Sequence, residues 1–159
     1  MGNKWGVKPE QAEFLVDLEK LLNKSIVFVD KQVWDTVAVE IKEDSVTKLV
    51  ISFCNLATLP ESITNLNSLQ SLELAGNKLS PLPESITHLK SLKELDLSGN
   101  KLTTFPESIV NLKSLQKLYL SENDLTTIPE SISNLKSLKE LILSGNKLDE
   151  VIKYFFKPC

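Results

Sequence analysis

Residues 92–114 read LKELDLSGNKLTTFPESIVNLKS, and the same spacing of apolar residues recurs on both sides of this stretch. The period is set by leucines that lie 23 residues apart, at Leu69, Leu92, Leu115 and Leu138. Within the unit, Leu95 and Leu97 alternate with acidic residues, which indicates a short strand with one buried face. One such unit cannot bury its apolar rows alone, so neighbouring units must stack. The sequence therefore predicts a solenoid of parallel strands.

An asparagine follows each strand, at Asn77, Asn100, Asn123 and Asn146, and Cys54 takes this place in the first repeat. The amide can bond backbone groups that the bend leaves unpaired. A segment such as 105–109, FPESI, comes next. Its proline suits the first turn of a helix, and its glutamate suits the positive end of the helix dipole. We therefore expect a short helix or 3₁₀ turn on the convex side of each repeat.

From Val46 to about Leu148, this pattern resembles the leucine-rich-repeat family. The resemblance implies an α/β fold, a right-handed solenoid with parallel strands on the concave face and short helical or 3₁₀ segments on the convex face. The expected repeats occupy residues 46–148 and start at 46, 69, 92, 115 and 138. We expect an N-terminal cap of a helix plus a hairpin in residues 1–45, and a C-terminal cap in residues 149–159.

The N-terminal cap follows from the need of a stack for a cover that is apolar inside and polar outside. Pro9 can open a helix over about residues 9–22. Its apolar stripe would comprise Phe14, Leu15, Leu18, Leu21 and Leu22. A strand over about 37–41 then precedes a turn and the first repeat strand, which predicts a hairpin over the solenoid edge, with Trp34 beneath it.

The C-terminal cap is predicted from the departure of the fifth repeat from the pattern after Leu148. Asp149 can cap a short helix that presents Val151, Ile152, Phe155 and Phe156. The alternative use of the two phenylalanines is exposure, which would promote end-to-end association of the nearly identical repeats.

Charge and composition limit the classes of partner. The 159-residue chain has a formal charge of −3 without a basic block, so nucleic acid is not an expected partner. The N-terminus mixes charged and apolar residues, unlike a signal peptide, and no apolar run approaches membrane-spanning length. Cys54 and Cys159 do not follow the paired spacing of the disulfide caps of secreted repeat proteins. We expect a cytoplasmic monomer that does not bind membranes.

Residues that could support catalysis are scarce. His88 is the single histidine, which limits nucleophilic triads and multi-histidine metal sites. A Cys54–His88 dyad is not expected, because the cysteine lies in the asparagine row whereas the histidine should point outward from the next repeat. The glutamates that recur once per repeat are typical of a solvated face; they are Glu61, Glu84, Glu107 and Glu130. We expect no enzymatic activity, no metal site and no cofactor.

Positions that vary while the framework repeats are those that the fold does not dictate. On the concave strands they form a central column of Val50, Glu73, Asp96, Tyr119 and Ile142. An exposed aromatic residue beside an exposed aliphatic one is typical of an interface centre. Strand propensity on an open surface is the alternative explanation. The candidate partner-binding residues are Val50, Phe53, Glu73, Asp96, Lys117, Tyr119, Lys139 and Ile142.

The size of the concave face limits its affinity. Strands about 4.8 Å apart, each exposing a few residues, offer an area on the order of 400 Å². A standard interface takes about 800 Å² from each partner, so weak or transient binding is expected unless loops or caps take part.

The Leu-Pro-Glu-Ser-Ile framework resembles that of intracellular leucine-rich-repeat proteins associated with Ras-type small GTPases, and similar repeats occur in archaeal and bacterial proteins. The resemblance implies an adaptor or scaffold whose partner is a protein, such as a small GTPase or another signalling protein. Two alternatives stay open: the chain is the recognition subunit of a larger enzyme, such as a ubiquitin ligase or a GTPase, or it is a structural protein that self-assembles.

Overall fold

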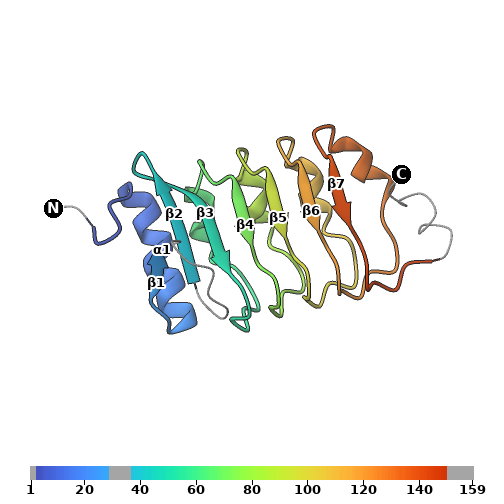
Figure 1. Cartoon of the computed structure of the whole chain (residues 1–159), viewed down its shortest axis with the longest axis horizontal. Helices are drawn as coiled ribbons and strands as arrows, with labels where there is room; N and C mark the ends of the chain where they lie inside the picture. Colours follow the sequence, from blue (N-terminus) through green and yellow to red (C-terminus); the bar gives the residue numbers. More distant parts are fainter. Residues whose placement is uncertain (1–2, 29–36, 150–159) are drawn as a thin grey trace.

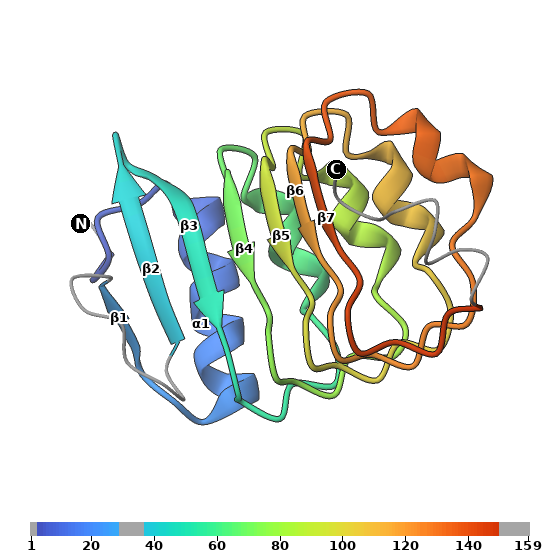
Figure 2. The ribbon, with the colours of Figure 1, turned by 45° about the vertical axis from the view of Figure 1, so that its right-hand side comes forward.

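A seven-stranded sheet organises the molecule (Figure 1). The computed structural model describes residues 3–28 and 37–149. The strands lie side by side in sequence order, from β1 to β7. Short helices form a second layer behind the strands, as the turned view in Figure 2 shows. This arrangement confirms the predicted solenoid.

The repeat strands are parallel and in register. They are β3 (Ser45–Ile51), β4 (Ser71–Glu73), β5 (Glu94–Asp96), β6 (Lys117–Tyr119) and β7 (Glu140–Ile142). Their pairing aligns Leu49, Leu72, Leu95, Leu118 and Leu141 in one row, each leucine beside its equivalent in the next repeat. The 23-residue period of the sequence thus becomes a column of leucines that points into the core.

Each of the first four repeats returns through a 3₁₀ helix, which decides between the two expected forms of this segment. The four are η1 (Glu61–Asn65), η2 (Glu84–His88), η3 (Glu107–Asn111) and η4 (Glu130–Asn134). A proline precedes each helix, and one isoleucine in each turns inward. Ile63, Ile86 and Ile109 are fully buried. The isoleucine column therefore closes the core opposite the leucine column.

The asparagines that follow the strands form a buried hydrogen-bond row, the asparagine ladder (Asn77, Asn100, Asn123 and Asn146). The Nδ2 atom of Asn100 donates to the carbonyls of Leu74 at 3.0 Å and Leu97 at 2.9 Å. Its Oδ1 atom accepts the amide proton of Leu79 at 3.0 Å. Each ladder residue thus bonds backbone groups of its own turn, as expected from the sequence, and it also ties that turn to the preceding repeat.

The N-terminal unit consists of α1 (Pro9–Leu22), β1 (Ile26–Phe28) and β2 (Val37–Lys42). The helix has Pro9 in its first turn and no side-chain cap, and it packs against η1. β2 pairs antiparallel with β3, which forms the expected hairpin. The Oε1 atom of Gln11 accepts the amide proton of Val46 at 2.8 Å, so a buried polar contact joins the helix to the first repeat.

Two features of this unit differ from the sequence-based prediction. β1 was not anticipated; it pairs parallel with β2, and its three apolar residues suit a strand. Leu21 is half exposed rather than part of the buried stripe. It lies roughly a quarter-turn from the centre of that stripe, which comprises the predicted Phe14, Leu15 and Leu18 together with Gln11 and Ala12. Trp34 lies outside the described residues.

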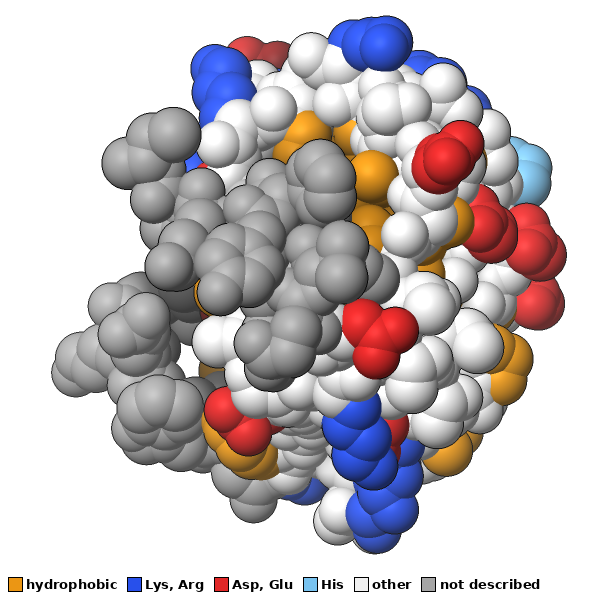
Figure 3. All heavy atoms as spheres, turned by 90° about the vertical axis from the view of Figure 1, so that its right-hand side faces the viewer, with side chains coloured by type: hydrophobic (Ala, Val, Ile, Leu, Met, Phe, Trp, Pro, Cys, Tyr) orange, Lys and Arg blue, Asp and Glu red, His pale blue; other side chains and the backbone are white. Residues whose placement is uncertain are grey.

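Burial of the leucine column decreases toward the C-terminal end. Leu95 and Leu118 are fully buried, whereas Leu141 is only partly buried. Figure 3 looks onto this end, where hydrophobic side chains show among polar ones. The residues predicted to cap it after Asp149 lie outside the described part of the chain.

In the two described segments, no helix has both the length and the apolar character needed to span a bilayer.

Candidate functional site

The outward-pointing residues of β3 to β7 form one continuous surface, here called the strand face, which is the predicted concave face. Strand register places Val50, Glu73, Asp96, Tyr119 and Ile142 side by side in one row. A second row beside it holds Lys48, Ser71, Glu94, Lys117 and Glu140. The central column expected from the sequence is therefore a contiguous row in the structure.

Ion pairs link neighbouring strands at two places on the strand face. The Lys48 ammonium group lies 2.5 Å from the Glu73 carboxylate. The Lys117 ammonium group lies 3.9 Å from the Glu94 carboxylate, and both side chains are partly exposed. Exposed pairs of this kind add little to stability, about 0–1 kcal/mol each. All four side chains are partly exposed, so their charges stay accessible to a partner.

Tyr119 is the centre of a polar cluster toward the C-terminal end of the strand face. Its hydroxyl donates to Glu140 Oε2 at 3.2 Å. Burial and, after it, the charges of the nearby Glu140, Glu94 and Asp96 carboxylates together raise the pKa of Tyr119 to about 12. Beside it in the same row, Ile142 keeps 38% of its surface exposed. An aromatic ring and an aliphatic side chain are thus adjacent within a negative field.

The Tyr119 cluster predicts a measurable titration. The tyrosine should ionise near pH 12 rather than 10. Because its pKa is raised only in the folded state, the stability that it contributes is complete below pH 10 and is lost as the pH rises toward 12. In a Tyr154→Phe background, phenolate absorbance reports Tyr119 alone, and Glu140→Gln should lower its midpoint. Glu61→Gln, on the convex side, is the control and should leave the midpoint unchanged. A midpoint that shifts with Glu61→Gln but not with Glu140→Gln would contradict this assignment.

Three of the candidate residues lie away from the central row: Lys117 is in the second row, and Phe53 and Lys139 lie outside both rows. Phe53 follows β3 and is half exposed, with its ring so close over Gly76 that a side chain on this glycine would overlap it. Lys139 precedes β7 and lies in a row at the edge of the strand face. There its Nζ atom contacts Gln116 Oε1 at 3.5 Å, as Lys93 contacts Gln70 at 2.9 Å.

Sequence reasoning left two carboxylates out of the candidate list. Glu94 and Glu140 flank Tyr119 in the structure and act on its pKa. They occupy the same repeat position as Lys117, which was a candidate. Strand equivalence could therefore have identified them, because the 23-residue period places all three in one row.

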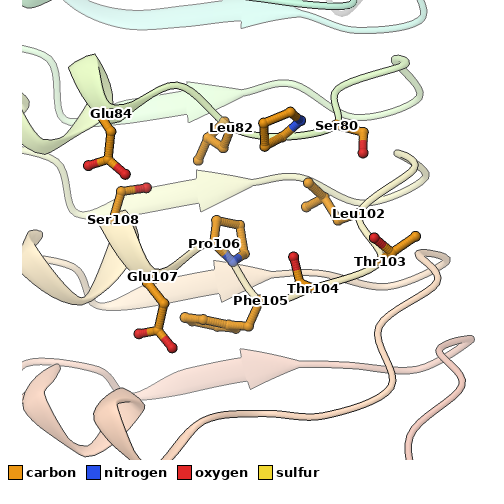
Figure 4. A pocket seen from close by; sticks show the side chains of 11 residues that line it. Ser80, Leu82, Glu84, Leu102, Thr103, Thr104, Phe105, Pro106, Glu107 and Ser108 are labelled. Atoms are coloured by element: carbon orange, nitrogen blue, oxygen red, sulfur yellow. The ribbon is translucent and has the colours of Figure 1, made fainter.

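A surface hollow of about 370 Å³ lies between the second and third full repeats, away from the strand face (Figure 4). Leu82, Leu102, Phe105 and Pro106 contribute apolar surface to it. Glu84 and Glu107 lie toward one end in Figure 4, and Thr103 and Thr104 toward the other. Among the described residues, its lining contains serine, threonine and glutamate side chains but no histidine, cysteine or lysine.

The residues considered for catalysis do not converge. His88 is exposed at the end of η2, and its Nδ1 atom lies 3.3 Å from the carbonyl of Ser85 in the same helix. The Cys54 sulfur lies 3.3 Å from the carbonyl of Ser52 and 3.9 Å from the Lys24 ammonium group. Within residues 3–28 and 37–149, no three histidine, cysteine, aspartate or glutamate residues could together hold a metal ion.

Comparison with known proteins places this geometry among leucine-rich repeats. The family model described as a leucine-rich repeat region matches residues 58–155. A chain of the BIR3–SERK2 complex from Arabidopsis thaliana is 36% identical with a TM-score of 0.64, and the match covers 87% of this chain and 81% of that one. A comparison with curated proteins finds no match.

Two further solved structures are similar over part of their length. A Leptospira interrogans leucine-rich-repeat protein is 34% identical with a TM-score of 0.61, and the match covers 89% of this chain and 37% of that one. The plant peptide hormone receptor RGFR1, solved in complex with RGF2, is 36% identical with a TM-score of 0.51 over 62% of this chain and 16% of the receptor. This chain therefore spans well under half the length of either protein.

Proposed function

This chain belongs to the leucine-rich-repeat family, and from that premise we propose that it is a protein-interaction module whose strand face binds a protein partner. The observation that carries the proposal is the adjacency of Tyr119 and Ile142 in the central row. Interface centres favour an aromatic anchor beside apolar surface, with charged groups around it. The strand face has this composition between β5 and β7.

The similar structures support a protein partner in general. One is a complex of BIR3 with SERK2, and another is a receptor with the hormone RGF2. Such frameworks share their core residues while variable surface positions select the partner. For this chain the variable positions are Val50, Glu73, Asp96, Tyr119 and Ile142.

We further propose that the module is a cytoplasmic adaptor in small-GTPase signalling, without catalytic activity of its own. The support is the framework at residues 59–63 and 82–86, LPESI in both repeats, which resembles that of Ras-associated leucine-rich-repeat proteins. A small GTPase among the captured proteins would support this assignment, and its consistent absence among specific partners would count against it.

The test is affinity capture from native lysate with a Tyr119→Ala, Ile142→Ala double variant. Because the strand face offers only about 400 Å², binding should be weak, so a chemical cross-link should precede washing. A partner that binds the original chain should be lost from the variant, since truncating central anchors typically costs more than about 1 kcal/mol each.

The matched control is an Asn134→Ala, Lys136→Ala double variant, which removes two exposed side chains on the opposite side of the repeat. Circular dichroism should show the same fold for both variants. Equal capture by the original chain and the Tyr119–Ile142 variant would move the binding site away from the strand face.

A further inference from the structure

The charges of the strand face are distributed unevenly. At its N-terminal end, Lys48 neutralises Glu73 across 2.5 Å. Toward the C-terminal end, three carboxylates surround Tyr119, and the Lys117 ammonium group approaches one of them, Glu94, to 3.9 Å. Among the described residues, Asp96 and Glu140 form no ion pair with a cation. The surface around Tyr119 therefore keeps an excess of negative charge.

We propose that the partner presents a basic segment, an arginine or lysine side chain beside an apolar one, which docks on Asp96, Tyr119, Glu140 and Ile142. This inference rests on the proposed function and names the chemistry of its partner. The four residues define what we call the Tyr119 patch.

Each part of the Tyr119 patch matches one part of such a segment. Asp96 uses Oδ1 to accept the amide proton of Ser98 at 2.8 Å, and Oδ2 accepts no hydrogen bond from the described residues. A guanidinium or ammonium group can donate to this oxygen. The partly exposed Tyr119 ring offers a cation a second contact through its π face. Ile142, with 38% of its surface exposed, provides the adjacent apolar contact.

The hydrogen bond from Tyr119 to Glu140 holds these groups in place before a partner arrives. The 3.2 Å contact crosses from β6 to β7 and fixes the phenol against the carboxylate. Burial is the main cause of the raised pKa of Tyr119, and the negative charge of the nearby carboxylates raises it in the same direction. Those carboxylates, which disfavour an anion at this point, favour a cation there. An acidic segment would meet repulsion from all three carboxylates.

The test measures binding of labelled synthetic peptides by fluorescence anisotropy. One peptide repeats the unit Arg-Ser-Leu-Ser, which places arginine and leucine on one face of an extended chain, and its counterpart repeats Glu-Ser-Leu-Ser. The arginine peptide should bind the original chain more tightly, and its affinity should fall as salt rises. Equal affinity for both peptides, or no binding of the arginine peptide, would overturn the inference.

Two variants with the same change in net charge locate the contact. Glu94→Gln, Asp96→Asn, Glu140→Gln should raise the Kd of the arginine peptide by about tenfold or more, which corresponds to about 1.4 kcal/mol. Glu61→Gln, Glu84→Gln, Glu130→Gln removes as many charges from the exposed starts of the 3₁₀ helices and should leave the Kd unchanged. Equal effects of the two variants would show nonspecific attraction and overturn the inference.

The same variants separate this inference from the function on which it rests. A captured partner that is lost with Tyr119→Ala, Ile142→Ala yet retained by the strand-face charge variant would support the proposed function and overturn the basic segment. A partner lost with both supports both. Capture unaffected by the Tyr119–Ile142 variant would overturn the proposed function itself.

Discussion

Replacing Asn100 with alanine is expected to lower the free energy of unfolding by about 3 kcal/mol or more. The change leaves the carbonyls of Leu74 and Leu97 and the amide of Leu79 without their bonds to the asparagine side chain. Asn100 is only 7% exposed, so water cannot readily replace these bonds. The two carbonyls keep one bond each, from Asn77 and Asn123, so the Leu79 amide is the group left without its partner. An unsatisfied buried amide costs about 1–3 kcal/mol, and each of the two lost bonds to the carbonyls adds about 0.5–1.5 kcal/mol. Urea unfolding followed by circular dichroism measures the effect.

Two further substitutions test whether the loss of stability comes from the amide donors of the asparagine and whether it depends on burial. Asn100→Asp keeps the shape and the acceptor oxygen but loses the amide donors, so it should destabilise the protein as strongly as alanine or more. Asn146→Ala removes the equivalent bonds to Leu120, Leu143 and Leu125 at the last rung of the ladder. Asn146 is less buried than Asn100, so its loss should cost less. If Asn100→Ala and Asn146→Ala lower the free energy of unfolding equally, the energy of the ladder bonds does not depend on how deeply the asparagine is buried.

The sequence predicted the repeat framework well because the framework is periodic. Once Leu72 and Leu95 lie on neighbouring strands, the 23-residue spacing also aligns Glu73 with Asp96 and Tyr119 with Ile142. The central row of the candidate site follows from this register without further information. Its binding role stays a prediction, because register places side chains but does not show what touches them.

The nonperiodic parts were predicted less well. β1 pairs with β2 through contacts that no repeat dictates. Leu21 has the residue type of a core position, yet the direction of α1 leaves it exposed. The bond of Gln11 to Val46 joins residues far apart in the chain, and nothing in the local sequence indicates it. These features depend on how the helix meets the sheet, which hydrophobic spacing alone does not specify.

The candidate site shows the same division between register and side-chain geometry. Residue identity and strand register predicted Tyr119 beside Ile142. The approach of Glu140 to the phenol depends on side-chain conformation, and so does the position of Phe53 over Gly76. The electrostatic character of the Tyr119 patch therefore required the structure.

The other large effect is expected at the leucine column, where Leu95→Ala should destabilise the protein by about 3 kcal/mol. Leu95 is fully buried between equivalent leucines on both sides, Leu72 and Leu118. Truncating a buried leucine removes buried apolar surface and leaves a cavity. The loss of unfolding free energy is larger where neighbouring residues cannot move in to fill that cavity. Strands on both sides restrict relaxation here. Chemical unfolding gives the free energy directly.

Leu141→Ala is the matched comparison, since it makes the same chemical change at the same repeat position. Leu141 is partly buried, and among the described strands it has a neighbour on one side only, β6. Both the lost burial and the residual cavity should be smaller, so the expected cost is about 1 kcal/mol. In a solenoid each repeat is stabilised mainly by its neighbours, so an inner repeat has two interfaces to lose and a terminal repeat has one. A cost at Leu141 as large as that at Leu95 would mean that the end of the leucine column is packed as tightly as its middle, which would support a cap after Asp149.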